Sequence, residues 1–440
     1  MITIRDPLWN TIRLDAAATR ILDSTAFQRL RYIKQLGHAH LVYPGATHTR
    51  FDHAVGVYHL ARRALGVLGE HGALDVLDAE DCALVPLAGL LHDIGHYPFS
   101  HALEELEPER IPGYHEALVG RFLADADIAT ALDAAAPDGV ARAEALIRGE
   151  SASPLQGLVS GSLDLDKIEY LERDARFCGV PYGEVDVDRL LHALTVVRDP
   201  VTGRYEVGVR EKGVAALESL LFAKYQMFRN VYWHHAVRAA TVMYKRIVTD
   251  ALDAGLIVPA ELVGATDEGL LFTLSSRAAA KSAGIAAAGR VGDGIASLRR
   301  RRLPKRASEV VAAEIGVGEA AEWLETDSPL KRRVEDALAT ELDLPCGAVY
   351  LDYPEKRAMF GLDLLVERRG GEVLRLGPAG RSGMIGLPRI ADELYRSARV
   401  LRLFTSGGRR SVTPAVLGRI AADGADAIVA RLDGGSPLLR

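Results

Sequence analysis

The chain is poor in cysteine and lacks long apolar runs. Its 440 residues include three widely spaced cysteines, Cys82, Cys178 and Cys346, and no CxxC pair. This spacing argues against a disulfide-stapled fold or a zinc site of paired cysteines, so we expect reduced, structural thiols. The longest uncharged apolar stretch, ALVPLAGLL at residues 83–91, is too short to cross a bilayer. The opening MITIRDPLWNTIRLD lacks the apolar core of a secretory signal, so we expect a cytoplasmic protein without membrane partners.

Excess positive charge is also missing. Lys and Arg total 53 against 59 Asp and Glu, a formal net charge of -6. Sequence-independent binding of nucleic acid depends on neutralising many phosphates, so we do not expect nucleic acid as a partner. The one dense basic run, RRRRLPKR at residues 299–306, could contact nucleic acid or a nucleotide phosphate. We favour the plainer interpretation, a solvated helix end before Pro304.

Helix-forming residues are abundant, and the chain is longer than one hydrophobic core usually supports. The sequence therefore predicts a mainly α protein with a helical core and a smaller C-terminal α+β lobe. We expect three units: a helical core at residues 1–250, a helical extension at 251–345, and the α+β lobe at 346–440. In the lobe, AVYLDYP, FGLDLLVERRG, EVLRLG and VLRLFTS have strand character, and LPRIADELYRSA has helix character.

The first elements can be placed from their periodicity and their breakers. The segment DSTAFQRLRYIKQLG has apolar residues three apart, which predicts a helix capped by Asp23 or Ser24 and ended by Gly37. A second helix begins near Arg50, and a buried apolar helix covers residues 81–93. Gly95 and Pro98 then force a turn, after which Ser100 can cap the next helix. Pro200 and Gly203 predict a hairpin at VVRDPVTGRYEVGV.

The stretch AGLLHDIGHYPFSHALEE, residues 88–105, places several histidines and acids directly after an apolar run. Burying such groups costs free energy unless a partner or a metal compensates them. Helix-end electrostatics would explain Glu104 and Glu105, but not the histidines. The stretch therefore predicts a metal site with acid/base residues beside it.

Four residues could hold such a metal: His53, the adjacent His92 and Asp93, and Asp166. Histidine with aspartate suits Mn, Fe, Co, Ni or Zn, and leaves positions open for water or a phosphate oxygen. Taken singly, His53 has the plainer reading of a buried core residue, and Asp166 that of a surface pair with its neighbour. Together they form the ordered pattern H…HD…D. Asp164 remains an alternative to Asp166.

The pattern is the signature of the HD phosphohydrolase superfamily, and the resemblance extends further. DSTAFQRLRYIKQLG, VYPGATHTRFDHAVGVYHLA, LLHDIGHYPFSHALEE, YHEAL and LDLDKIEYLERDA closely resemble the HD-domain deoxynucleoside triphosphate triphosphohydrolases. The similarity covers roughly residues 1 to 245. In the opening RDPLWNTIRLD, Asn10 stands where this family usually has glycine.

The resemblance implies a divalent metal (Mn, Fe, Mg, Co, Ni or Zn) on His53, His92, Asp93 and Asp166. It implies His101, Glu104 and His115 as the catalytic group, with glutamate where the family often has aspartate. Deoxynucleoside triphosphates would be held by Gln35, Leu36, Arg50, Lys167, Tyr170, Asp174 and Tyr232. His101 and Glu104 are three residues apart, hence neighbours on a helix face. We expect His96 to support a metal ligand rather than to bind a second metal. His234 and His235 we interpret as structural.

The resemblance also points to regulation. Asp23, Gln28 and Arg31 match positions that, in regulated members, help to bind an activating guanine nucleotide between subunits. Such a site would require a homo-oligomer, a dimer or a tetramer. A capping aspartate and ordinary helix-surface polar residues explain the same three positions equally well.

The leading hypothesis is a metal-dependent hydrolase that converts a dNTP to deoxynucleoside and inorganic triphosphate. Because fold and metal site do not fix the substrate, the alternative within enzymes is a phosphohydrolase of a cyclic or signalling nucleotide. A third hypothesis is a nucleotide- or nucleic-acid-binding regulator with a vestigial site. The complete set of ligands argues against the third.

Overall fold

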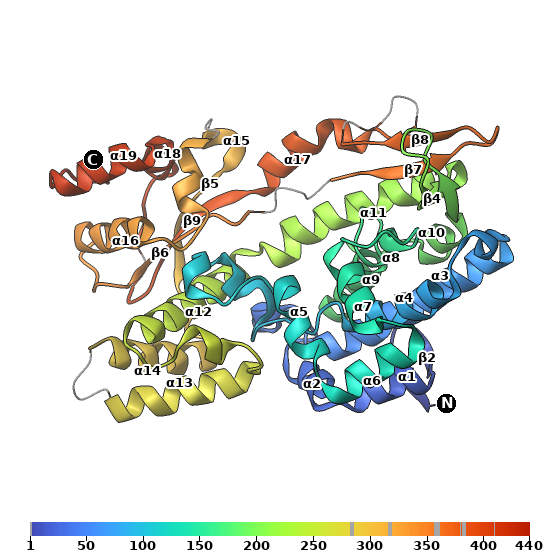
Figure 1. Ribbon diagram of the computed structural model, residues 1–440. Helices are drawn as coiled ribbons and strands as arrows, with labels where there is room; N and C mark the ends of the chain where they lie inside the picture. The colour runs from blue at the N-terminus through green and yellow to red at the C-terminus, as the bar shows by residue number, and fades with distance from the viewer. Residues whose placement is uncertain are drawn as a thin grey trace.

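The computed structural model describes residues 2–281, 286–315, 319–355, 361–378, 380, 384–408 and 410–440. Within these ranges the protein is mainly helical, with small sheets toward the C-terminal part, which confirms the predicted fold class (Figure 1). None of the described helices is long and apolar enough to span a membrane. The α-helices are α1 (Ala16–Asp23), α2 (Thr25–Gln28), α3 (Arg50–Glu70), α4 (Ala79–Leu91), α5 (His115–Leu123), α6 (Ala126–Ala135), α7 (Gly139–Arg148), α8 (Gln156–Val159), α9 (Leu165–Cys178), α10 (Val187–Ala193), α11 (Val214–Met227), α12 (His235–Asp253), α13 (Asp267–Lys281), α14 (Ala286–Arg299), α15 (Ala312–Ile315), α16 (Pro329–Glu341), α17 (Ala391–Ala398), α18 (Pro414–Ala422) and α19 (Ala425–Asp433).

Shorter helical turns and nine strands complete the described elements. The turns are η1 (Arg29–Tyr32), η2 (Gly37–Leu41), η3 (Ala73–Val76), η4 (Ser100–Glu105), η5 (Pro108–Arg110), η6 (Glu211–Gly213), η7 (Phe228–Tyr232), η8 (Pro259–Leu262), η9 (Glu319–Leu324) and η10 (Leu387–Ile390). The strands are β1 (Ile2–Asp6), β2 (Asn10–Leu14), β3 (Leu194–Arg198), β4 (Tyr205–Arg210), β5 (Lys305–Val311), β6 (Val349–Asp352), β7 (Leu364–Glu367), β8 (Val373–Leu376) and β9 (Val400–Thr405).

The main core surrounds α3, which packs against α4 and α9. Its apolar side chains, such as Leu60, Leu90 and Ile168, are completely buried. Burying each such side chain contributes about 1.5–3 kcal/mol, so this packing dominates the stability of the N-terminal half. A second core forms where α12 packs on α14 and α14 on α13, and a third lies between α16, α18 and the sheet of β5, β9 and β6.

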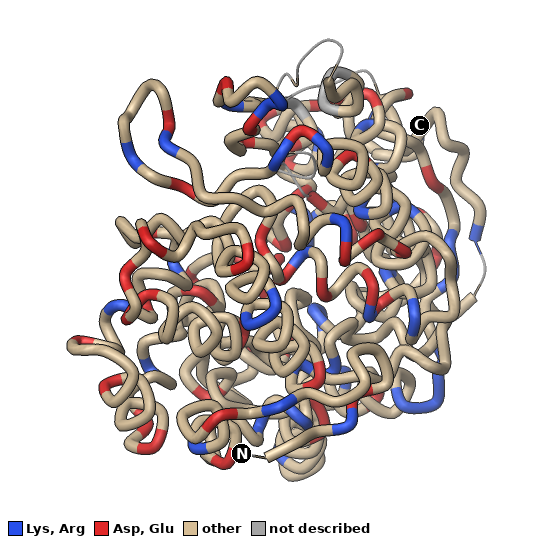
Figure 2. Tube along the Cα trace, turned by 90° about the vertical axis from the view of Figure 1, so that its right-hand side faces the viewer, with Lys and Arg blue, Asp and Glu red and all other residues tan. Residues whose placement is uncertain are grey.

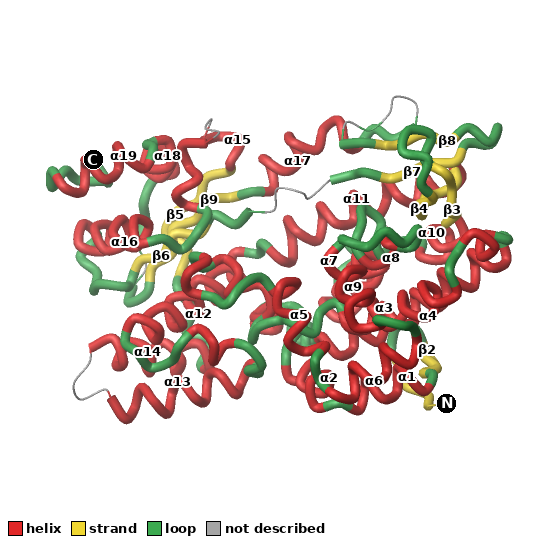
Figure 3. The backbone as a smooth tube through the Cα atoms, in the orientation of Figure 1, coloured by secondary structure: helices red, strands yellow, loops and turns green. Residues whose placement is uncertain are grey.

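The strands beyond residue 346 enter two separate sheets. Strands β5, β9 and β6 form one antiparallel sheet, whereas β7 and β8 extend the β3–β4 hairpin, with β7 parallel to β4. Figure 3 shows the two sheets at opposite sides of the view. The predicted strands and the predicted hairpin are present. The three-unit division stays a prediction, but residues 346–440 contribute both to the N-terminal core and to the third core, which they share with β5 and α16.

The helix predicted from Asp23 to Gly37 is wrong in its second half. Ser24, not Asp23, caps α2 by accepting the amide of Phe27 at 3.2 Å, and the chain tightens into η1. Long-range contacts override the helical pattern here, because Arg29 donates to the carbonyls of Ile94, His96 and Ala265.

The cap predicted at Ser100 is also wrong. Ser100 lies inside η4 with a left-handed φ of 59°. Its hydroxyl donates to the Lys34 carbonyl at 2.8 Å and accepts from Arg50 Nε at 3.1 Å, so it ties together two elements of the site.

The basic run lies at the protein surface, where all six of its Lys and Arg residues are exposed. Helix α14 ends at Arg299 as expected, but β5 begins at Lys305, where no strand was predicted. Arg299 pairs with Glu268 at 3.0 Å, Arg301 donates to the Leu41 carbonyl at 2.7 Å, and Arg306 pairs with Glu309 at 2.7 Å. Figure 2 shows both signs of charge distributed along the trace.

Candidate metal centre

The first two histidines are placed by helix ends. Helix α3 begins after Thr49, which forms a capping box with Asp52, so His53 lies in the first helical turn. Helix α4 ends at Leu91, which leaves His92 and Asp93 at its C-terminal end, next to the predicted turn. Two segments that are 39 residues apart thus present their histidines to one another.

The third segment is the start of α9. Asp164 is its N-cap and accepts the amide of Lys167 at 3.0 Å. Asp166, the second residue of α9, points instead toward the two histidines. The structure therefore favours Asp166 over Asp164 as the ligand, because the capping hydrogen bond already engages Asp164.

The distances fit one divalent cation. Ligand atoms of His53, His92 and Asp166 lie within 4.8 Å of one another. His53 Nε2 is 3.0 Å from Asp166 Oδ1 and 3.2 Å from His92 Nε2, and His92 Nε2 is 3.4 Å from Asp166 Oδ1. Donors bound about 2.1 Å from one ion are about 3.0 to 3.4 Å apart, whether tetrahedral or octahedral.

The tautomers supply an independent argument. His92 Nδ1 lies 2.8 Å from the Gly89 carbonyl oxygen, which can only accept, so Nδ1 carries the proton. His53 Nδ1 lies 2.6 Å from Glu169 Oε2 and donates to that carboxylate. In the neutral rings, both Nε2 atoms therefore carry lone pairs that face each other and Asp166. Without a cation these lone pairs and the Asp166 carboxylate repel one another, whereas a cation placed between them would attract all three.

Asp93 lies at the edge of this group. Its oxygens are 3.4 Å from His92 Nε2 and 3.5 Å from His53 Nε2, and Oδ2 is 2.5 Å from Arg50 Nη1. Burial opposes ionisation of Asp93, but Arg50, His92 and His96 outweigh it and hold its pKa well below the usual value. A permanently charged carboxylate thus faces the site.

The histidine pKa values show how anionic the site is. Burial disfavours the charged ring of His53, yet hydrogen bonds with Asp166 and Glu169 raise its pKa to about 10. Burial also lowers the pKa of His92, but the Asp93 and Asp166 carboxylates outweigh burial, so the pKa of His92 is raised as well. The surroundings therefore attract positive charge, which a divalent cation would supply in place of protons.

A buried ion-pair chain that the sequence analysis missed holds His53 in place. Glu169 accepts from His53, from Arg173 Nε at 2.7 Å and from Trp9 Nε1 at 2.9 Å. Arg173 Nη2 also pairs with Asp6 Oδ2 at 3.0 Å. The sequence signals it only by the i, i+4 spacing of Glu169 and Arg173, which places both residues on one face of a helix.

The hairpin of β1 and β2 brings Asp6 to Arg173 in this series of ion pairs. Asn10, which replaces the usual glycine, has a left-handed φ of 62°. Asparagine tolerates this conformation better than most non-glycine residues, so Asn10 can occupy this position of the turn.

Gly56 on α3 leaves room for the ion-pair chain. A Cβ at this position would lie 1.9 Å from Glu169 Oε1. We expect Gly56→Ala to lower the free energy of unfolding by about 1–3 kcal/mol through overpacking, and to loosen His53. At Gly66 on the same helix a Cβ meets nothing within 4 Å, so Gly66→Ala should raise stability by up to about 1 kcal/mol. Urea unfolding of both variants tests this, and equal effects would contradict it.

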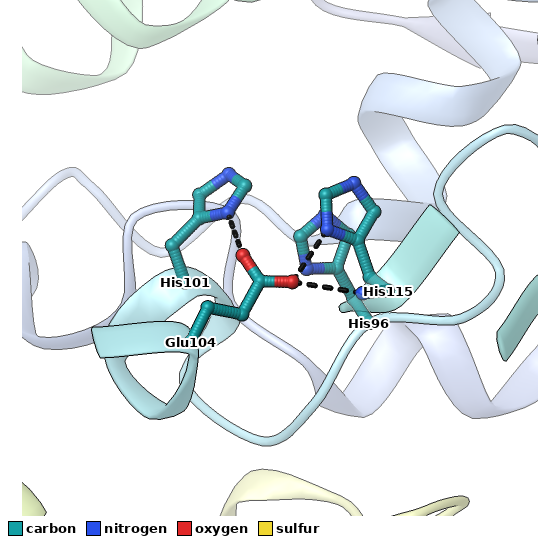
Figure 4. Close-up of side chains that lie close together, drawn as sticks. All are labelled: His96, His101, Glu104 and His115. Carbon is teal, nitrogen blue, oxygen red and sulfur yellow. Dashed lines mark hydrogen bonds and ion pairs between the residues drawn. The ribbon is translucent and has the colours of Figure 1, made fainter. Parts of the chain in front are cut away.

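The second group, His96, His101, Glu104 and His115, adjoins the first (Figure 4). Glu104 accepts from His101 Nδ1 at 2.7 Å and from His115 Nδ1 at 2.6 Å, and it also accepts the His115 amide at 2.9 Å. Figure 4 shows both rings with Nε2 on the side away from the carboxylate. One carboxylate therefore orients two imidazoles, although it replaces the shorter aspartate.

His96 connects the two groups. Its Nε2 lies 3.1 Å from Asp93 Oδ1, and its ring stacks on His115 at 3.9 Å. Gly95 permits this approach, because a Cβ there would lie 2.2 Å from the His115 carbonyl oxygen. The four atoms of the second group could also hold a metal by distance, but both Glu104 oxygens are already engaged by imidazole Nδ1 atoms.

Charges around the second group set its protonation. Burial lowers the pKa of His115, but the Glu104 carboxylate outweighs burial and raises it. Burial also opposes the ionisation of Glu104, yet His115 and His101 hold its pKa well below the usual value. His115 is consequently suited to carry a proton near neutral pH.

Of the expected substrate residues, Arg50 and Lys167 lie next to candidate metal ligands. Arg50 is buried and bound to Asp93, so it joins the metal group directly. Lys167 pairs with Asp164 and donates to the Gly161 carbonyl at 2.7 Å. Both cations thus stand beside the candidate centre.

Asp174, Tyr170 and Tyr232 form a second set. Tyr232 donates to Asp174 Oδ2 at 2.7 Å, and His48 Nε2 lies 2.8 Å from Asp174 Oδ1. The rings of Tyr170 and Tyr232 are 6.5 Å apart. His48 was not predicted, since a histidine before Thr49 carries no local signal of a partner 126 residues away.

Gln35 and Leu36 lie where η1 meets η2. The Gln35 amide donates to the His48 carbonyl at 3.0 Å, and the Gln35 carbonyl lies 3.5 Å from Arg50 Nη2. The side-chain oxygen of Gln35 is buried without a hydrogen-bond partner. Leu36 is half-buried against the core. Backbone contacts thus place Gln35 beside Arg50.

Comparison with known proteins identifies the fold. A model described as HD domain matches residues 50–147, and a model described as HD associated region matches residues 185–381. The chain therefore contains an HD domain followed by an HD associated region. The HD domain thus contains His53, His92, Asp93 and the whole second group, whereas Asp166 follows it.

Individual relatives extend this result. An uncharacterized protein of Methanocaldococcus jannaschii, MJ1154, is 37% identical over 56% of this chain and 49% of its own length. The human deoxynucleoside triphosphate triphosphohydrolase SAMHD1 is 29% identical over 57% of this chain and 44% of its own. The chain spans about half the length of such curated relatives. A phosphohydrolase structure from Bacteroides thetaiotaomicron, 21% identical, matches 92% of this chain and all of that chain with a TM-score of 0.70, which supports the fold alone.

The expected regulatory residues lie outside the matched HD domain. Asp23 is exposed at the end of α1, and Gln28 Nε2 donates to the Leu22 carbonyl at 2.8 Å. Arg31 donates to Gln28 Oε1 at 2.9 Å and lies over the Phe51 ring at 3.4 Å. The three residues share one surface segment, where the regulatory role stays a prediction.

His234 and His235 lie at the start of α12 and belong to neither group with metal-binding distances among the described residues. His234 accepts the Ala236 amide at 3.3 Å, which gives it the function of an N-cap. This contact agrees with their interpretation as structural residues.

Proposed function

We propose that the protein is a metal-dependent hydrolase that splits a dNTP into deoxynucleoside and inorganic triphosphate. The observation that carries the proposal is the pair of Nε2 lone pairs of His53 and His92, which converge with Asp166. The similarity to SAMHD1 and the adjoining His–Glu–His group support the substrate and the reaction. His53, His92, Asp93 and Asp166 would hold the cation, which polarises phosphoryl oxygens when bound.

The residues of this chain then have separate tasks. Arg50 and Lys167 supply positive charge for the phosphate chain. Water attacks the α-phosphorus, so one P–O bond forms while the bond to the sugar 5′ oxygen breaks, and the proton that the water loses passes to solvent. His115 gives that oxygen the proton it needs, and Glu104 keeps His101 and His115 oriented. Tyr170, Tyr232 and Asp174 contact the sugar, and Gln35 and Leu36 lie near the base and ribose.

Regulation and assembly form the outer part of the proposal. An activating nucleotide would bind at Asp23, Gln28 and Arg31 between subunits of a homo-oligomer. The exposed Asp23 carboxylate and the Arg31 guanidinium suit a guanine edge and a phosphate. A dNTP assay with and without GTP, combined with light scattering, tests both parts, and GTP-independent activity of a monomer would refute them.

The reaction itself is tested by product analysis. The purified full chain is incubated with each dNTP, each NTP and Mn²⁺, and the products are separated by anion exchange. Inorganic triphosphate together with deoxynucleoside supports the proposal. Monophosphate products, or attack on a cyclic or signalling nucleotide alone, would show a different phosphohydrolase, and nucleotide binding without turnover would show a vestigial site.

A further inference from the structure

The segment η4, which carries His101 and Glu104, is not stable on its own. Phe99 and Ser100 at its start have left-handed φ values of 58° and 59°, a region that costs free energy for non-glycine residues. Its six residues exceed the usual length of a 3₁₀ run, and no side chain caps its first turn. Its conformation therefore depends on contacts with the rest of the protein.

The start of η4 is held from two sides. The Phe99 amide donates to the buried Asp267 Oδ1 at 2.7 Å, and Ser100 bonds with Lys34 and Arg50 as described above. These contacts fix the backbone before His101, but they do not reach the other end of η4.

The end of η4 is held by a buried charge cluster. Glu105 accepts from Arg238 Nη1 at 2.7 Å, from Arg238 Nη2 at 2.8 Å and from Lys245 Nζ at 2.8 Å, both residues on α12. Arg238 also donates to Asp352 of β6, with Nη2 at 2.6 Å and Nε at 3.1 Å from its oxygens. The Asp327 amide donates to the Glu105 carbonyl at 3.3 Å.

This cluster joins the C-terminal sheet to the catalytic group through one peptide bond. Glu104 reaches toward His101 and His115, while its neighbour Glu105 reaches toward α12. Fixing Glu105 therefore fixes the backbone from which Glu104 orients both imidazoles. A shift of about 1 Å in such a group can cost about a hundredfold in rate.

We propose that Arg238, Lys245 and Asp352 are positioning residues, which hold Glu105 so that Glu104 keeps His101 and His115 in register. The proposal rests on the function proposed above for His101, Glu104 and His115. The C-terminal sheet would then contribute to the site, because Asp352 on β6 holds the Arg238 guanidinium, which in turn holds Glu105 at the end of η4.

The test compares four variants of the full chain in the dNTP assay. Glu105→Gln and Arg238→Met should lower kcat about tenfold to a hundredfold, with KM and metal content close to wild type. Arg238→Lys should recover part of the loss, since it keeps one charge near Glu105. Arg246→Met is the matched control: Arg246 lies on the same helix, and its buried partner is Glu335 of α16. It should lower thermal stability and leave kcat unchanged.

Hydrogen exchange measured by mass spectrometry supplies a readout that does not need activity. Peptides covering residues 97–106 should exchange faster in Glu105→Gln than in wild type, and at the wild-type rate in Arg246→Met. If the wild type releases no triphosphate, the function proposed above fails, and unchanged exchange would then overturn the positioning role as well.

The two failures are thus distinguishable. With an active wild type, unchanged kcat in Glu105→Gln overturns the positioning role even if exchange is faster, and so does an equal loss of kcat in Arg246→Met. If Arg238→Met does not fold, Glu105→Gln decides the matter, because it keeps the shape of the side chain.

Discussion

Asp166→Asn is expected to abolish metal binding and activity together. The amide keeps the size of the side chain but presents a neutral oxygen to His53 and His92, whose Nε2 atoms lie 3.0 and 3.4 Å away. Losing about 4 kcal/mol of transition-state stabilisation corresponds to a fall of about a thousandfold in kcat/KM. Plasma emission analysis of the purified variant and triphosphate release measure the two effects.

Asp164→Asn is the matched control. Asparagine is as good an N-cap as aspartate, so α9 should begin as before, but the charge opposite Lys167 is lost and the free energy of unfolding should fall by about 1–3 kcal/mol. Metal content should stay at the wild-type value. Loss of metal in Asp164→Asn with retention in Asp166→Asn would reverse the assignment.

Glu104→Gln is expected to lower kcat by about a hundredfold or more while the metal stays bound. The amide can serve only one imidazole as an acceptor, so one of His101 and His115 loses its orientation, and proton transfer typically contributes about 10²–10⁴ in rate. Burial alone would lower the pKa of His115, and the Glu104 charge raises it. In wild type, activity should therefore fall as pH rises through that raised pKa.

Removal of the Glu104 charge should lower the pKa of His115, so the loss of activity at alkaline pH should begin at a lower pH than in wild type. The pH profile of kcat in wild type and Glu104→Gln, with metal content measured in the same samples, checks both parts. Activity that is unchanged, or that is lost together with the metal, would contradict a proton-transfer role for the second group.

The sequence places the candidate ligands at helix ends, because the signals for those ends are local. A capping box, an apolar run that ends in His92 and Asp93, and a break at Gly95 are written in neighbouring residues, and each fixes a helix end. The sequence alone could not separate Asp164 from Asp166, because both lie in the same turn. In the structure Asp164 accepts a capping hydrogen bond from the Lys167 amide, whereas Asp166 faces His53.

The parts that could not be predicted depend on distant partners. The chain from Asp6 through Arg173 and Glu169 to His53 joins residues up to 167 positions apart, and no periodicity encodes it. The same holds for η1, where Arg29 binds carbonyls of remote loops, and for Glu105, whose partner Arg238 lies 133 residues away. Helical periodicity describes the buried face of an element, but not which charged group will meet it.

An anomalous-scattering map of the crystallised full chain, collected at the absorption edge of whichever metal the purified protein contains, tests the central claim most directly. We predict one peak per chain, within bonding distance of His53 Nε2, His92 Nε2 and a carboxylate oxygen of Asp166. A chain that binds no metal, or a peak located only among His96, His101 and His115, would contradict it.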